Sequence, residues 1–290
     1  MNPNRANKIW FIGLGILAMS FASILIKLCD APALVIAAYR LAIAAAFYTL
    51  WVMADKHKNR RQLANLPWKA LLMAGLFLAL HFAAWIASLA STSVASSVVL
   101  VQLSPVFVAF GSLFILQEKV TRFQWLGILL AVLGAITIGA HDFYRQQSSL
   151  AGNILAVVGA MGSAGYFVAG RICRKKMDTA QYVAVVYAIA AAATIFCLAL
   201  LQQPLFGYPS PTLLLLLAIA IGPQIIGHTS LNWALKYFSA TQVAIIVLIE
   251  PVGASLLALF LLHEPLSLEK IAGALLILFG VGLAWIKVRE

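Results

Sequence analysis

Apolar runs long enough to cross a lipid bilayer recur along almost the whole chain. A hydrocarbon core roughly 30 Å thick requires about 20 apolar residues in a helix, and runs of this length are separated here only by short polar gaps. Of the 290 residues, 63% are hydrophobic and 10% are charged, whereas soluble domains are about half apolar and a quarter charged. The sequence therefore predicts an integral membrane protein.

Charges, prolines and polar clusters mark the ends of ten expected transmembrane helices. The first five are expected at 9–27, 33–54, 68–89, 94–116 and 122–140, and the second five at 152–170, 180–201, 212–235, 241–261 and 268–286. Arg5 and Lys8 precede the first apolar run, which is about as long as a full span and lacks a convincing cleavage site. We therefore expect it to remain in the mature protein as the first helix.

The basic residues fall at every second gap between the apolar runs. With the N-terminus inside, sixteen of the 20 Lys and Arg residues lie in cytoplasmic segments and three on the opposite face, as the positive-inside rule requires. Both termini are thus predicted to be cytoplasmic. The net charge of +11 forms no single patch, which argues against nucleic acid as a partner.

The strongest pattern is an internal repeat. Residues 93–140 align without a gap on 239–286 at a constant offset of 146. The aligned pairs are Pro105 with Pro251, Glu118 with Glu264, Gly127 with Gly273, and Gly134 with Gly280. Five spans per half make the second half enter from the opposite side, a property of many secondary transporters. The predicted fold is an all-α membrane protein of two inverted five-helix repeats, residues 1–141 and 150–290.

The residues that repeat also resemble a known family. Leu103-Ser104-Pro105-Val106-Phe107 with Glu118, then Asn232-Trp233-Ala234-Leu235, Glu250-Pro251-Val252 and Glu264, are similar to the drug/metabolite transporter superfamily and, within it, to the EamA type. The resemblance covers nearly the whole chain. The resemblance implies a transporter of the cell membrane, which is the inner membrane in a bacterium. The family includes exporters of amino acids, other metabolites and toxic cations.

Two charged residues lie well inside expected spans, Arg40 and Glu250. An ionisable group at the bilayer centre costs about 2.5–3.5 kcal/mol on insertion scales, so such groups usually face a cavity. Glu250 is either a proton acceptor or cation partner for transport, or a structural acid paired with Arg40. Arg40 is either a substrate contact or a structural charge whose long side chain reaches outward.

Polar residues at helical spacing form two stripes. The third span carries His81, Trp85 and Ser88, and the eighth carries Gln224, His228 and Asn232. Because lipid-facing polar stripes are costly, both are expected to line a central substrate cavity. Tyr166 and Trp233 are expected as its aromatic walls.

Pro105 and Pro251 are predicted to kink the fourth and ninth helices, because each proline removes a backbone hydrogen bond. Gln102 and Ser104 stand just before the first proline as Glu250 stands before the second, so they are also expected to line the cavity. The fifth and tenth helices each repeat glycine at an interval of seven residues, and the sixth helix contains four glycines between residues 159 and 170. These small residues predict close helix packing.

No motif indicates catalysis, a cofactor or a metal. Cys29, Cys173 and Cys197 have no metal-binding spacing, and His263-Glu264 is followed by Pro265 rather than by a second histidine one turn later. The chain is expected not to be an enzyme and to have a small-molecule substrate and membrane lipid as its partners. Its oligomeric state is not encoded in any pattern that we recognise.

The expected function is secondary transport of small organic solutes by alternating access, with export of amino acids or of aromatic or amphipathic metabolites favoured by the resemblance. Proton coupling and downhill facilitation are both open. The rival functions are a membrane enzyme or lipid-handling protein, which would need a reactive cluster near one interface, and a membrane sensor or assembly subunit that binds without transporting.

Overall fold

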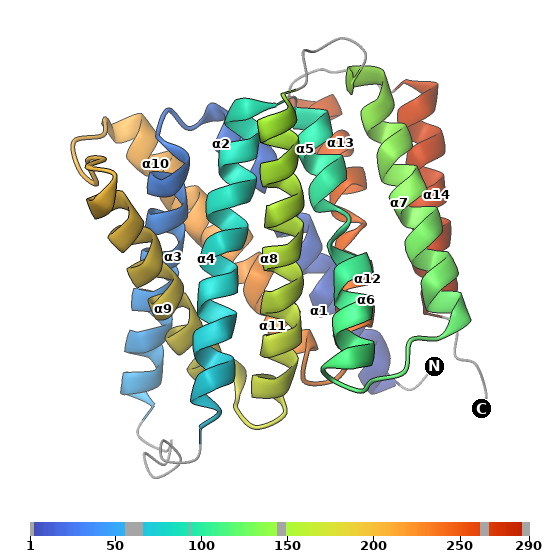
Figure 1. The fold of residues 1–290 in the computed structure, drawn as a ribbon, viewed down its shortest axis with the longest axis horizontal. Coiled ribbons are helices and arrows are strands. Elements are labelled where there is room, and N and C mark those ends of the chain that lie inside the picture. The colour runs from blue at the N-terminus through green and yellow to red at the C-terminus, as the bar shows by residue number, and fades with distance from the viewer. Residues whose placement is uncertain (1–2, 56–65, 93, 144–148, 262–266, 286–290) are drawn as a thin grey trace.

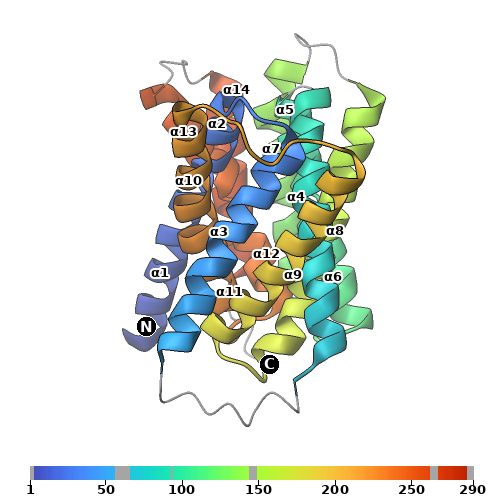
Figure 2. The same ribbon diagram turned by 90° about the vertical axis from the view of Figure 1, so that its left-hand side faces the viewer.

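The computed structural model describes residues 3–55, 66–92, 94–143, 149–261 and 267–285, and within these ranges the regular structure is entirely helical. Several residues used in the sequence argument lie outside the described ranges, namely 56–61, Arg145, His263, Glu264, Pro265, Lys287 and Arg289. In the orientation of Figure 1 the helices run roughly vertically, and the two chain ends lie on the same side of the molecule (Figures 1 and 2).

The helices follow one another with short connections. The first half contains α1 (Pro3–Ser20), α2 (Ala22–Leu28), α3 (Ala33–Ala54), α4 (Trp68–Ser91), α5 (Val94–Val101), α6 (Ser104–Phe114) and α7 (Arg122–Phe143). The second half contains α8 (Leu150–Arg174), α9 (Thr179–Leu200), α10 (Ser210–Ile219), the π-helix η2 (Ala220–His228), α11 (Thr229–Ala234), α12 (Ala240–Val247), α13 (Glu250–Leu261) and α14 (Leu268–Ala284).

Eight helical segments of the described chain are long and apolar enough to cross a membrane. A further apolar helix, Arg122–Ile138, is shorter, and α14 has 17 residues. The prediction of an all-helical, multi-pass membrane protein is therefore confirmed, and the finer prediction of ten spans is taken up below as a proposal. Large apolar side chains such as Phe114 and Leu214, 79% and 67% exposed, point outward, as expected where lipid replaces water as the solvent.

Polar side chains fix the starts of four helices in the second half. Ser149, Asp178, Ser239 and Ser267 each accept a hydrogen bond from the backbone N–H three residues later, which satisfies a donor that would otherwise lack a partner. Ser239 and Gln242 form a complete capping box. These caps lie at helix ends, where the chain changes direction.

Two of the expected spans are each divided by a two-residue break that lies just before a proline. The first break separates α5 from α6 at residues 102–103, and the second separates α12 from α13 at 248–249. Pro105 and Pro251 are the second residues of the helices that follow. Since proline has no N–H and its ring disfavours a helical turn before it, each break falls just before its proline, and the two breaks are 146 residues apart.

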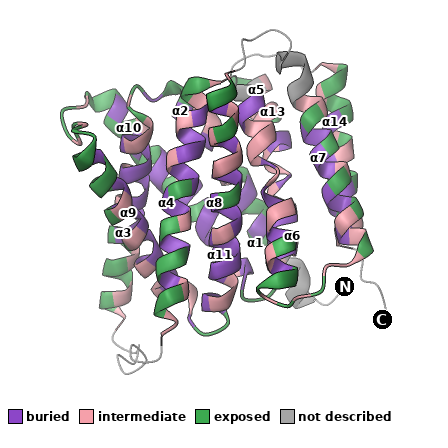
Figure 3. Ribbon diagram, viewed as in Figure 1, coloured by how far each residue is buried: buried purple, intermediate pink, exposed green. Residues whose placement is uncertain are grey.

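Each of the closest helix pairs joins the two halves. α4 packs on α8, α3 on α9, and α7 on α14, and α7 and α14 lie side by side at one end of the molecule (Figure 1). In Figure 3 buried and exposed residues alternate along most helices, so that each helix has a covered face and an outward face.

Glycines allow the backbones of these pairs to approach closely. A Cβ atom added to Gly162 of α8 would lie 2.8 Å from the backbone nitrogen of His81 on α4. Along α7 and α14, Gly127 faces the backbone of Gly280, and Gly134 faces that of Gly273. These contacts run antiparallel and require small residues on both sides.

We predict that Gly280→Ala destabilises the protein, because its new Cβ would lie 2.7 Å from the carbonyl oxygen of Gly127. Overpacking of this kind typically costs about 1–3 kcal/mol. Gly282→Ala on the same helix is the matched control, since its Cβ would meet no described atom within 4 Å and alanine favours a helix by about 1 kcal/mol. Thermal unfolding in detergent measures both, and equal melting temperatures would contradict close packing of α7 on α14.

Candidate functional site

A buried cavity lies between the two halves of the molecule. Its walls come from α1, α2, α3, α4 and α8, from η2, and from the broken helices α5–α6 and α12–α13. The space open to the centre of a water molecule is about 50 Å³, room for a few waters. A metabolite would therefore enter only after the helices around the cavity have moved.

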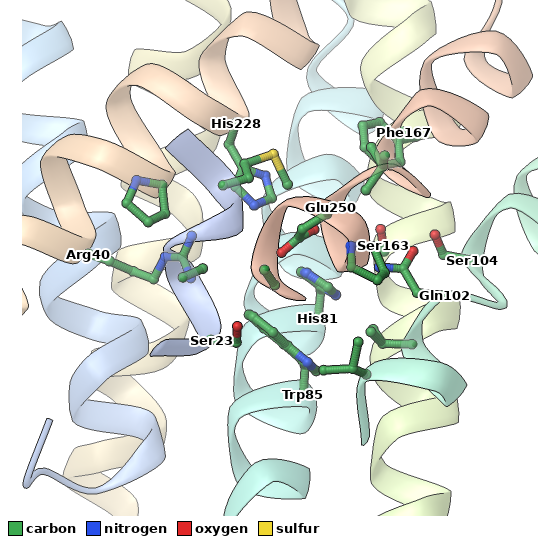
Figure 4. A pocket seen from close by; sticks show the side chains of 18 residues that line it. Ser23, Arg40, His81, Trp85, Gln102, Ser104, Ser163, Phe167, His228 and Glu250 are labelled. Atoms are coloured by element: carbon green, nitrogen blue, oxygen red, sulfur yellow. The ribbon is translucent and has the colours of Figure 1, made fainter. Parts of the chain in front are cut away.

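Residues singled out in the sequence contribute much of this lining. Those that reach the cavity are Arg40, His81, Trp85, Gln102, Ser104, His228, Glu250 and Pro251. The others do not line it in this conformation: Ser88, Pro105, Tyr166, Gln224, Asn232 and Trp233. Figure 4 shows Arg40 and Glu250 reaching the cavity from different helices, with His81 and Trp85 on a third.

Arg40 is fully buried on α3. Its Nε donates a 3.0 Å hydrogen bond to Oε1 of Gln224, and its guanidinium carbon lies 3.7 Å from the centre of the Phe82 ring. Nη1 and Nη2 have no hydrogen-bond partner among the described residues. The side chain is thus held by its Nε edge and by the aromatic face while both terminal nitrogens are left free.

Glu250 begins α13 at the second helix break. Its backbone carbonyl accepts a long, 3.4 Å hydrogen bond from the hydroxyl of Ser20, whereas its carboxylate makes no hydrogen bond to the described residues. The ion pairs found in the described chain do not include one between Glu250 and Arg40. Two opposite charges therefore face one cavity without contacting each other.

Aromatic rings of α4 form a flat wall of the cavity. The rings of His81 and Trp85 stack with planes 6° apart and centres 5.9 Å apart. Nδ1 of His81 lies 2.9 Å from the carbonyl oxygen of Gly159, and because a carbonyl only accepts, Nδ1 carries the hydrogen. Ser88 lies one helical turn after Trp85 and does not line the cavity. Its hydroxyl donates a hydrogen bond to the Trp85 carbonyl oxygen and also bonds to the hydroxyl of Ser97.

The eighth expected span contains a π-helix, which changes how its polar stripe is arranged. Pro223 lies inside η2, and Gln224, His228 and Asn232 are all buried. His228 faces the cavity and packs its ring edge-on against Phe82 at 5.1 Å. Gln224 reaches Arg40 instead, so the stripe divides between the cavity and its supporting residues.

A hydrogen-bonded network supports the cavity wall from behind. The Tyr166 hydroxyl donates to Oδ1 of Asn232 at 2.7 Å, and Nδ2 of Asn232 donates to the Tyr187 hydroxyl at 3.1 Å. Tyr187 in turn bonds to Thr229 at 3.1 Å. Tyr166 and Asn232 thus use their polar groups on each other, joining α8, α9 and α11. Trp233 packs against Phe11, with ring centres 4.8 Å apart.

The sequence argument did not single out Ser163 and Phe167 on α8 or Ser23 on α2, all of which line the cavity. Ser163 follows Gly162, whose close contact with α4 turns this face of α8 toward the centre. The signal in the sequence that could have indicated Ser163 was its position next to Gly162, one of the glycines along which α8 packs closely on α4. Ser23 also lines a second cavity of about 220 Å³, which includes Lys27 and lies between α2, α3 and α4.

Comparison with known proteins supplies the family. The model of the EamA-like transporter family matches residues 7–140 and again residues 150–286. The chain belongs to the EamA-like transporter family. The resemblance found in the sequence is therefore confirmed, as is the expectation of a multi-pass protein of the cell membrane.

Relatives of this EamA-like transporter are named as transporters. An uncharacterized transporter of Archaeoglobus fulgidus is 27% identical over 223 residues, which are 76% of this chain and 77% of the relative. The pseudopaline exporter CntI of Pseudomonas aeruginosa is 29% identical over 176 residues, 60% of each chain. A crystal structure with a TM-score of 0.80 and 20% identity covers 97% of this chain and 98% of its own, and so shares the fold.

An ion-pair cluster joins the α6–α7 connection to the end of α8 in this EamA-like transporter. Glu118, in the connection from α6 to α7, pairs with Arg171 at 2.8 Å and with Lys175 at 3.2 Å. Arg171 also donates to the carbonyl oxygen of Leu235. Burial raises the pKa of the Glu118 carboxyl, but the hydrogen bonds and charges of Arg171 and Lys175 outweigh it, so the pKa lies below its ordinary value of 4.5.

We predict that Glu118→Gln lowers the free energy of unfolding at pH 7 by about 1 kcal/mol. A carboxyl whose pKa is lowered by folding stabilises the protein above its ordinary pKa, and this contribution is lost as the pH falls below 4.5. The difference in melting temperature between wild type and variant should therefore shrink in acid. Asp30→Asn, at an exposed site, is the control, and a difference independent of pH would contradict the ion pairs.

Proposed function

We propose that this protein is a secondary transporter that exports small organic solutes across the cell membrane by alternating access around the central cavity. The observation that carries the proposal is a cavity that contains Arg40 and Glu250 at the junction of the two halves of an EamA-family membrane protein, placed where two helices are broken. Amino acids and aromatic or amphipathic metabolites are the proposed solutes. The proposed partners are the solute and membrane lipid.

The proposed topology is ten transmembrane helices in two inverted repeats, with both termini in the cytoplasm. The α7–α14 contact supports it, because each half contributes the same two positions, 146 residues apart. Gly127 meets Gly280 and Gly134 meets Gly273, which is the pattern of a two-fold, antiparallel contact. The distribution of basic residues supports the orientation.

In the proposed cycle, the breaks before Pro105 and Pro251 act as hinges. Irregular backbone at membrane depth is tolerated where protein covers it, and it permits one part of a helix to move relative to the other. The cluster of Glu118, Arg171 and Lys175 holds one end closed and would separate when that end opens.

The proposed solute packs its apolar part on the parallel rings of His81 and Trp85. Aromatic rings offer stacking and attraction to cations. We therefore predict that Trp85→Ala lowers solute affinity at least about tenfold while the protein still folds. Thermal shifts with amino acids, aromatic amines, quaternary cations and sugars identify the solute. Trp51→Ala is the matched control, since Trp51 is 58% exposed on α3; unchanged affinity in Trp85→Ala would place the solute elsewhere.

Glu250 is the proposed proton acceptor if transport is coupled to protons. We predict that Glu250→Gln removes the pH dependence of solute flux in proteoliposomes, because glutamine does not titrate. Asp30→Asn should retain the wild-type pH profile. A Glu250→Gln variant that transports with the wild-type pH profile would remove Glu250 from coupling and favour downhill facilitation.

A further inference from the structure

The cavity contains an unused pair of hydrogen-bond donors. Arg40 is fully buried, and its Nη1 and Nη2 have no hydrogen-bond partner in the part of the chain that the structure describes. The two described neighbours of the guanidinium do not accept from Nη1 or Nη2. Oε1 of Gln224 accepts from Nε, and the Phe82 ring covers one face of the guanidinium. A buried charged group that lacks partners is costly, so an arginine left in this state indicates a role that needs its free nitrogens.

The second buried arginine shows how this chain satisfies a guanidinium that serves structure alone. Arg174 is 1% exposed. Its Nε donates to the Asn232 carbonyl at 2.9 Å, its Nη2 donates to the Thr179 hydroxyl at 2.6 Å, and its Nη1 donates to the Met177 carbonyl. All three nitrogens are used there, whereas at Arg40 one is used. The difference separates a structural arginine from one that has donors to offer to a ligand.

The carboxylate of Glu250 in the same cavity makes no ion pair or hydrogen bond with the residues that the structure describes. Glu250 lines the cavity with Arg40, yet the two do not form an ion pair. Figure 4 shows them reaching the cavity from separate helices, α3 and α13, beside His81 and Trp85. An anion-binding group and a cation-binding group thus line one cavity, together with the aromatic side chains of His81 and Trp85.

We propose that the transported solute is a zwitterion whose carboxylate binds Nη1 and Nη2 of Arg40 and whose ammonium group binds the carboxylate of Glu250. The planar guanidinium presents two parallel N–H groups that match a carboxylate. The apolar part of the solute then lies along His81 and Trp85. The inference rests on the transport function proposed above and narrows it, since amines, quaternary cations and sugars lack the carboxylate that Arg40 requires.

The test uses purified wild-type protein and three matched probes. The common amino acids are screened by thermal shift and titration calorimetry, and each amino acid that binds is compared with its decarboxylated amine and its deaminated acid. Removing the carboxylate should weaken binding at least about tenfold, because a hydrogen bond to a charged group is lost. Removing the amino group should weaken it as well. Amines that bind as tightly as the amino acids, or no binding by any amino acid, would overturn the inference.

Variants assign each end of the solute. Arg40→Gln should reduce affinity for the amino acid and the deaminated acid at least about tenfold, and leave affinity for the amine unchanged. Arg40→Lys, which keeps the charge but lacks the two-pronged geometry, should recover only part of the loss. Glu250→Gln should show the reverse pattern, weakening the amino acid and the amine but not the acid. Equal losses for all three probes would overturn the assignment.

Arg174→Gln is the control for loss of a buried arginine. It should lower the melting temperature of the ligand-free protein without changing the ratio of affinities for amino acid and amine. The comparison of probes on wild-type protein decides the question even if an Arg40 variant fails to fold.

Flux in sealed proteoliposomes separates this inference from the transport function. Amino acids that bind with the expected pattern but are not transported would remove the transport function and leave the binding assignment. Transport of an amine or a sugar that is unchanged in Arg40→Gln would remove the assignment and leave transport intact.

Discussion

The absence of water from the hydrocarbon core constrains every part of this protein. Backbone groups there must find partners within the chain, and helices do so along their whole length. Three of the departures from regular helix, at the α5–α6 and α12–α13 breaks and in η2, border the central cavity. The surrounding helices can cover these segments only because glycines bring α4 close to α8 and α7 close to α14. Close packing and irregular backbone therefore depend on each other.

The same constraint explains the polar side chains. Tyr166, Asn232 and Tyr187 satisfy one another in a network that joins three helices, and Gln224 meets Arg40. Among the described residues that line the cavity, Arg40, Trp85 and His228 keep buried nitrogen atoms without a hydrogen-bond partner. Polar groups in this interior thus belong to two kinds, those that hold the helices in place and those that are open to a ligand.

Much of the fold follows from the apolar runs along the sequence and from the polar residues and prolines that end them. The expected span at 33–54 corresponds to α3, Ala33–Ala54, because an apolar run bounded by Pro32 and Asp55 leaves little freedom at either end. The spans expected at 94–116 and 212–235 are less regular than the pattern indicates. Proline suggested the first break, but η2 depends on tertiary contacts around Pro223 and Gln224 that no periodicity encodes.

The candidate site was harder to predict for a related reason. Helical spacing placed Gln224, His228 and Asn232 on one face, yet which neighbour each side chain meets depends on helix rotation, which η2 alters. Charge was the better guide, since Arg40 and Glu250 both reach the cavity. Small residues were the weakest guide to the cavity lining. Ser163 lies among the glycines that pack α8 on α4, and the sequence alone does not show that it lines the cavity.

The π-helix also makes the two halves unequal. Two identical inverted repeats would exchange conformations as the protein turned from one side to the other, and the inward-open and outward-open forms would then have the same free energy. Here α4 is a continuous helix, while the third helix of the second half contains η2. In the proposed cycle, this difference in backbone favours one of the two forms before any solute or gradient acts.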